Sequence, residues 1–206
     1  QSTAYRMQFL REEFAEQIDG EAFVTAAYED TIQQADGLPD DSPLEKRMRQ
    51  MMLLNLEWFM QTLLDRKDRM SMANALEVRV PFCDYRIAEY LYNVPWEMKE
   101  YKGYEKGLLR AAMQDYLPEE VLWRKKSPYP KTHNPDYLQA VRKMLYAILQ
   151  DKNAPLFQLV KREEIEQLCM QPSTVQWYGQ LMAYPQTIAY FVQLNAWMQQ
   201  YQVEIR

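Results

Sequence analysis

The sequence predicts an all-α chain, and three observations support this fold class. Apolar residues recur at the helical period along most of the 206 residues. Helix start signals, in which a capping residue is followed by proline or an acidic first turn, recur along the chain. Extended structure is expected in a single short stretch, "EVRVPF", which follows a long helix-period run. We therefore expect helices packed on helices.

The first half of the chain alternates apolar and charged residues near the helical period. This pattern predicts helices over residues 3–17 and 21–35. The turn formers of "ADGLPDDSP" then end the second helix.

The segment "SPLE" opens the longest predicted helix. Ser42 can cap it, Pro43 suits its first turn, and Glu45 can complete a capping box. We expect this helix to run to about Arg66. Because residues 51–64 are apolar on almost every side, we expect it to form the buried centre of the fold.

Shorter helices are predicted in the second half. Their expected ranges are 85–93, 105–116, a helix opened by Pro118 with Glu119 and Glu120 in its first turn, a helix starting at Asn134-Pro135, 161–170, and 175–200 with an interruption at Pro185. No internal repeat or long linker separates these elements, so residues 1–206 are expected to form one domain or one large piece of a domain.

Composition excludes several classes of function. The net charge of −5 gives no overall attraction to nucleic acid or to an anionic membrane. Cys83 and Cys169 have no metal-site spacing, and His133 is the only histidine, so we expect no metal ligands in the chain. The longest apolar run, about 14 residues including Glu57, is too short to span a bilayer. We expect a cytoplasmic protein with no nucleic-acid or membrane partner.

A local basic run is the exception to the acidic balance. The stretch "VLWRKKSPYPK", residues 121–131, holds four cations and no acidic residue. Upstream, Lys106 and Arg110 lie four residues apart, on one face of the predicted helix. Two such basic elements can bind the phosphates of a nucleotide, although a basic run is more often a solvated face. The five glycines never cluster, so a phosphate-binding glycine loop would have to come from elsewhere.

Three blocks of sequence carry a family resemblance. The stretch "LLDRKDRMSMANALEVRVPFCD" resembles L-L-x-R-x-D-R-x-S-M followed by E-x-R-x-P-F-L-D of the glutamine-dependent asparagine synthetases. The stretch "EKGLLRAAMQDYLPEEVLWRKK" is similar to that family's K-x-x-L-R, L-P-x-x-V and W-R-x-K. The blocks occur in the family's order and span roughly residues 63–126. The chain thus resembles the C-terminal part of the synthetase domain of these enzymes.

The resemblance implies a fold and a reaction. The chain would be the helical C-terminal portion of an ATP-pyrophosphatase-type α/β domain. Such enzymes use ATP and Mg²⁺ to adenylylate the side chain of aspartate, and ammonia from glutamine then displaces AMP. The family's S-G-G-x-D-S loop and its glutaminase domain are not in this sequence, so we expect a fragment that is inactive alone. We expect a homodimer for the full-length protein.

The resemblance also implies site residues. Lys126 matches the lysine of W-R-x-K, which in this family contacts the α-phosphate. A fixed ammonium stabilises the negative charge that develops on phosphoryl oxygens during adenylyl transfer. Lys106 matches the lysine of K-x-x-L-R and is a candidate for the β,γ-phosphates or the leaving pyrophosphate. Arg110 either supports it or pairs with an acidic neighbour, Glu105 or Asp115.

The charged residues inside "EVRVPF" are expected to be scaffold beside the site. In an extended stretch, Glu77 and Arg79 point to one side of the chain. We expect a buried, mutually satisfied network rather than substrate contact, in which the possible partners are Asp68, Arg69 and Asp84.

Two departures from the family pattern keep alternatives open. Cys83 replaces the leucine of P-F-L-D, a conservative packing change. The stretch "SPYPKTHNP" after Lys126 differs from many asparagine synthetases, and we expect His133 within it to lie on the surface. Two alternatives remain: a related carboxylate-adenylating enzyme that forms an amide or a β-lactam, and a helical interaction module without catalysis.

Overall fold

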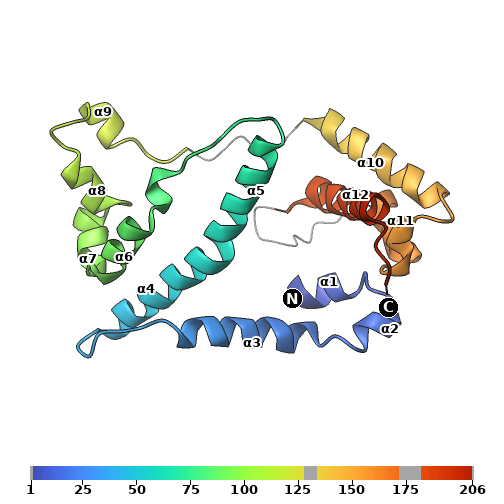
Figure 1. Cartoon of the computed structure of the whole chain (residues 1–206), viewed down its shortest axis with the longest axis horizontal. Helices are drawn as coiled ribbons and strands as arrows, with labels where there is room; N and C mark the ends of the chain where they lie inside the picture. Colours follow the sequence, from blue (N-terminus) through green and yellow to red (C-terminus); the bar gives the residue numbers. More distant parts are fainter. Residues whose placement is uncertain (1, 128–133, 172–181, 206) are drawn as a thin grey trace. The chain divides into compact units, whose positions relative to one another are not determined.

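The computed structural model describes residues 2–127, 134–171 and 182–205. Within these residues the chain is helical and contains no β-strand, which confirms the predicted all-α class. The chain divides into two compact units, unit 1 with residues 1–25 and 129–206, and unit 2 with residues 26–128. The helices below carry the labels of Figure 1.

Unit 1 combines the start of the chain with its C-terminal part. Figure 1 shows its longer helices grouped in orange and red. Its elements are α1 (Ser2–Met7), α2 (Glu12–Ala15), α10 (Pro135–Gln150), the 3₁₀ turn η4 (Pro155–Gln158), α11 (Arg162–Met170) and α12 (Tyr184–Tyr201), while α3 (Gly20–Gln33) crosses from unit 1 into unit 2.

A hydrophobic core holds unit 1 together. Leu145 of α10, Ile165 of α11 and Ile188 of α12 have no exposed surface, and Leu156 of η4 is equally buried. The backbone N–H of Leu156 donates to the buried Asn195 Oδ1 at 3.2 Å, so this polar side chain is satisfied inside the core. The amphipathic patterns of the sequence therefore correspond to real buried faces in this unit.

The N-terminal helix is shorter than predicted. The sequence favours one helix over residues 3–17, but α1 ends at Met7 and Leu10 forms an antiparallel bridge with Val160. The N–H of Lys161 donates to the carbonyl of Phe9 at 2.8 Å. This long-range pairing requires an extended backbone, which breaks the helix.

Unit 2 contains one long helical rod and a series of short helices. Its elements are α4 (Pro43–Leu54), the π-helix η1 (Asn55–Met60), α5 (Gln61–Met72), the 3₁₀ turn η2 (Pro81–Cys83), α6 (Tyr85–Asn93), α7 (Trp96–Lys99), the 3₁₀ turn η3 (Tyr101–Gly103), α8 (Gly107–Ala112) and α9 (Glu119–Leu122).

Helix starts match the capping signals of the sequence. Ser42 and Glu45 form the predicted capping box at the start of α4, with Pro43 in the first turn. Asn134 caps α10, also as predicted. Pro185 lies in the first turn of α12 and so opens this helix instead of interrupting it, while the predicted helical residues 175–181 lie outside the described part of the chain.

The expectation that the long helix forms the buried centre is wrong. The rod continues past Arg66 to Met72, and three of its large apolar side chains, Trp58, Phe59 and Leu63, are between 36% and 52% exposed. Its buried residue is instead Arg49. An apolar surface shows where a helix can pack, but a neighbour must be present to bury it. No helix in the described residues has the length and apolar character needed to cross a membrane.

Candidate functional site

Lys126 lies in an irregular segment directly after α9. Residues 124–127 have no regular secondary structure, and their side chains are exposed. The ammonium of Lys126 is therefore open to a ligand. Because this segment has no helical hydrogen-bond pattern of its own, the position of Lys126 depends on contacts to neighbouring elements.

Lys106 does not lie on the helix face that the sequence predicts. The predicted helix 105–116 is reduced to α8, and Lys106 precedes it in the left-handed conformation, with φ of 59°. This conformation is uncommon for a residue other than glycine. The exposed Lys106 side chain therefore extends from a turn. The prediction that Lys106 and Arg110 share one face of a helix is wrong.

Close backbone packing fixes the start of α8. Gly107 is buried, and a Cβ atom built on it would lie 2.4 Å from both the backbone nitrogen and the backbone oxygen of Tyr101. Only glycine allows this approach. The turn that carries Lys106 is therefore held against η3 by a contact that no other residue type can make.

Arg110 uses its guanidinium to bind backbone carbonyls. Its Nε donates to the carbonyl of Glu105 at 2.8 Å and its Nη2 to that of Arg124 at 3.1 Å. Its Nη1 donates to the carbonyl of Leu122. Glu105 is thus a neighbour of Arg110, as the sequence suggested, but it contributes its backbone oxygen. All three guanidinium nitrogens have protein acceptors, which does not favour Arg110 as a phosphate ligand.

Trp123 lies between two side chains of the same region. Its ring centroid is 4.9 Å from that of Tyr104, and the guanidinium carbon of Arg110 lies 5.9 Å from its centre. An open groove beside Trp123 is lined by one lysine and two glutamates, Lys102, Glu119 and Glu120, among others. This mixed charge does not favour a polyanion in the groove.

Glu77 and Arg79 form the predicted pair but are not buried. Arg79 Nε lies 3.0 Å from Glu77 Oε1, so the two side chains do share one side of the extended segment. The side chain of Glu77 is 67% exposed, and that of Arg79 is 83% exposed. The expected burial is wrong for this chain, because no described element covers that side.

Of the other expected scaffold residues, Asp68 and Arg69 are exposed and Asp84 is half-buried. Arg69 makes an i,i+4 ion pair with Asp65 on α5, at 2.7 Å, and Asp68 is exposed on the same helix. Asp84 caps α6 and pairs with Arg86 at 2.6 Å. The hydrogen bond from Arg86 lowers the pKa of the Asp84 carboxyl.

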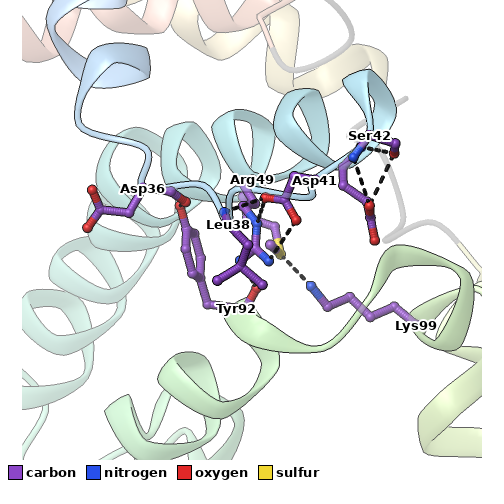
Figure 2. Close-up of polar contacts among 9 residues, drawn as sticks. Asp36, Leu38, Asp41, Ser42, Arg49, Tyr92 and Lys99 are labelled. Atoms are coloured by element: carbon purple, nitrogen blue, oxygen red, sulfur yellow. Dashed lines mark hydrogen bonds and ion pairs between the residues drawn. The ribbon is translucent and has the colours of Figure 1, made fainter.

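A buried ion pair in unit 2 is the main polar cluster that the sequence did not reveal. Figure 2 shows Arg49 of α4 facing Asp41 in the preceding loop, with Nε and Oδ2 2.7 Å apart. Their side chains are 7% and 5% exposed. Arg49 Nη1 also donates to the carbonyl of Tyr92 at 2.7 Å, and the N–H of Leu38 donates to Asp41 at 2.8 Å. The cluster ties the loop, α4 and α6 together.

The surroundings of this cluster shift several pKa values. The hydrogen bond from Arg49, followed by that from Leu38, lowers the pKa of the Asp41 carboxyl. Lys99 places its ammonium 3.2 Å from the sulfur of Met52, and burial together with the charge of Arg49 lowers its pKa (Figure 2). The sequence offered little signal for this cluster, because Arg49 is one of several charged residues in the first half of α4.

Metal ligands are not assembled in the described residues. Within them, no three histidine, cysteine, aspartate or glutamate side chains form a cluster that could hold an ion. Cys83 and Cys169 are free thiols. His133 and the basic Lys131 lie outside the described residues, so the expectations for that loop remain predictions.

Comparisons with known proteins agree with the resemblance. The asparagine synthase family model matches residues 2–199. "Asparagine synthetase [glutamine-hydrolyzing] 3" of Bacillus subtilis (strain 168) is 43% identical over 207 aligned residues, which cover 99% of this chain and 34% of that protein. The "Asparagine synthetase [glutamine-hydrolyzing]" of Gallus gallus is 43% identical, and that of Homo sapiens 40%, each over 89 residues, or 42% of this chain and 15% of the relative.

These comparisons also show how much of a relative the chain spans. It spans about a third of the length of the Bacillus relative, and the match runs through nearly all of its 206 residues. The family model covers both compact units. By the match to the family model over residues 2–199, this chain belongs to the asparagine synthase family.

Proposed function

We propose that this chain supplies part of the active site of an ATP-dependent asparagine synthetase. In this reaction a carboxylate oxygen of the aspartate side chain attacks the α-phosphorus of ATP, and the bond to pyrophosphate breaks. Ammonia derived from glutamine then attacks the acyl carbon, and AMP leaves. The products are asparagine, AMP and pyrophosphate.

Lys126 is the residue we assign to the chemical step. Its exposed ammonium follows residues 122–124, which Arg110 holds through the backbone carbonyls of Leu122 and Arg124. This placement of a cation on a fixed segment is the observation that supports the proposal. A positioned positive charge stabilises the negative charge that builds up on the α-phosphate oxygens. Lys106, exposed on its tightly packed turn, is assigned to the β,γ-phosphates or to the departing pyrophosphate.

The remaining parts of the site are assigned to protein outside these residues. The described residues contain no cluster suited to Mg²⁺, so we derive no step through the ion. The chain spans a third of the Bacillus relative, and the glutamine-hydrolysing activity belongs to the whole protein. We place the full-length enzyme in the cytoplasm, as a homodimer that binds ATP, aspartate and glutamine.

The test uses a full-length enzyme, of the length of the Bacillus relative, that contains these 206 residues. It compares substitutions of two neighbouring lysines. Lys126→Ala is expected to lower kcat for aspartate-dependent pyrophosphate release by roughly 10²–10³-fold, the loss typical of one transition-state charge donor. The KM for ATP and the Tm should change little. Lys125→Ala removes the adjacent exposed lysine and should leave kcat within about twofold.

The outcomes separate the alternatives. Equal kcat in both variants and in the wild type would exclude Lys126 from catalysis and favour the helical interaction module. Pyrophosphate release that depends on a different carboxylic acid would favour a related amide-forming or β-lactam-forming enzyme. A screen of carboxylate acceptors under the same conditions therefore completes the experiment.

A further inference from the structure

We infer that Arg110 is a positioning residue that sets the place of Lys126, and not a ligand of the nucleotide. The inference rests on the proposed function, because it explains how the assigned catalytic lysine is held. It starts from the three hydrogen bonds of the Arg110 guanidinium, all of which end on backbone oxygens of unit 2.

The first step is the choice of acceptors. Nη1 and Nη2 of Arg110 bind the carbonyls of Leu122 and Arg124, the residues on either side of Trp123. A planar guanidinium offers its N–H groups in a rigid fork, so two such bonds fix both the distance and the orientation of what they hold. The chain from α9 to Lys126 is therefore anchored to α8 two residues before the lysine.

The second step is the limited support that the other described residues give to this segment. Residues 124–127 are irregular, and the amide of Arg124 makes a long hydrogen bond of 3.4 Å to the carbonyl of Val121. The Trp123 ring packs against the ring of Tyr104 and also against the guanidinium of Arg110. Arg110 thus contributes both the backbone anchor and part of the ring packing at the point where the helix ends.

The third step concerns Arg110 itself. Its Nε donates to the carbonyl of Glu105, next to the left-handed Lys106, so the same guanidinium also holds the turn of the second lysine. Turning this group toward a phosphate would break these bonds and leave the carbonyls without their donor. A buried carbonyl left without a donor destabilises the folded chain. Leu122 is buried, so its carbonyl has little access to water as a replacement.

Arg110→Lys is the informative substitution, because it keeps the positive charge and removes the fork. In the full-length enzyme we expect kcat for pyrophosphate release to fall about 10–100-fold, the range for a misplaced catalytic group, with the KM for ATP within about twofold. Arg86→Lys is the matched control. Arg86 pairs with Asp84 on an exposed face of α6 and should tolerate the change.

A double-mutant cycle with Lys126→Ala tests whether Arg110 acts through the lysine. If it does, Arg110→Lys should lower kcat by less than twofold in the Lys126→Ala background. Losses that multiply in the double variant would overturn the inference, since they would show an independent role. Wild-type kcat in Arg110→Lys would overturn it as well, because the charge alone would then suffice.

Hydrogen exchange on this chain provides a readout that does not depend on activity. In Arg110→Lys we expect faster amide exchange in a peptide that covers residues 122–127, and unchanged exchange in α6. Unchanged exchange at 122–127 would refute the anchor. The proposed function would instead be contradicted if the wild-type enzyme had no aspartate-dependent activity, or if Lys126→Ala left kcat unchanged. The exchange experiment would still decide the inference about Arg110.

Discussion

The helices of unit 1 and the long rod of unit 2 are both rich in apolar residues, yet they are stabilised differently. In unit 1, side chains of α10, α11 and α12 meet in a closed core, and Leu145, Ile165 and Ile188 have no exposed surface. In unit 2, Leu122 is the one buried apolar side chain among the described residues, while the rod buries Arg49. Unit 1 thus relies on hydrophobic burial, and unit 2 relies more on specific polar contacts.

The largest effect should come from truncating a core residue of unit 1. Ile188→Ala is expected to lower the free energy of unfolding by about 2–5 kcal/mol, because it leaves a cavity where the side chain was fully buried. The matched change in unit 2, Phe59→Ala, removes a side chain that is 44% exposed and should cost about 1 kcal/mol or less. Urea unfolding measures both. Equal losses would mean that the rod is as well buried as the core.

The buried ion pair should give the next largest effect. Arg49→Met strands the Asp41 carboxylate and removes the donor to the carbonyl of Tyr92, so we expect the Tm of the chain to fall by roughly 6–12 °C. Thermal unfolding followed by circular dichroism provides the measurement. Arg47→Met, on an exposed position of the same helix, is the control and should shift the Tm by about 2 °C or less. A comparable fall in both variants would contradict a special role for the buried pair.

A smaller effect should appear as a pH dependence of the same pair. The pKa of Asp41 is lowered in the folded chain, so the stabilisation is complete above its ordinary value of 3.8 and is lost as the pH falls through the folded pKa. The Tm difference between wild type and Asp41→Asn should therefore be constant between about pH 5 and 7 and shrink below about pH 4. A difference that persists to pH 2 would show that the charge of Asp41 is not what stabilises the loop.

The smallest effect should come from the exposed ion pair. Glu77→Gln removes the partner of Arg79 at a site where both side chains are mostly exposed, and we expect a loss of about 0.5 kcal/mol or less. The loss should disappear at high salt, because exposed pairs are screened. Urea unfolding of the chain at low and high salt tests this. A loss above about 2 kcal/mol would show that the segment is buried in solution.

The sequence predicted what local chemistry determines. The capping box of Ser42 and Glu45 and the cap at Asn134 located two helix starts, because such signals involve residues only a few positions apart. It could not predict the end of the helix before Leu10, since the bridge partner Val160 is 150 positions away along the chain. It could not predict the exposure of the rod, because hydropathy describes the helix and not its neighbours.

For the candidate site, too, the sequence predicted local features and not long-range contacts. The positions of Lys106 and Lys126 came from motifs, and their catalytic roles remain predictions. The contacts of Arg110 could not be foreseen, because backbone carbonyls exist at every residue and leave no mark on the sequence. The burial of Arg49 is a similar case, since its partner Asp41 lies in a loop whose path depends on the fold.

The π-helix between α4 and α5 lets the rod carry an extra residue without changing its direction. A π-turn holds an extra residue compared with an α-turn. Removing one residue from Asn55–Met60 would let this segment wind as α-helix, and the tighter winding would compensate for the deletion, so α5 would keep its direction relative to α4. A deletion within α5 has no such compensation, because each residue of an α-helix corresponds to a rotation of about 100°. The segment of Glu77 would then leave the helix in a new direction, so the rod tolerates a deletion in its middle better than one in its second half.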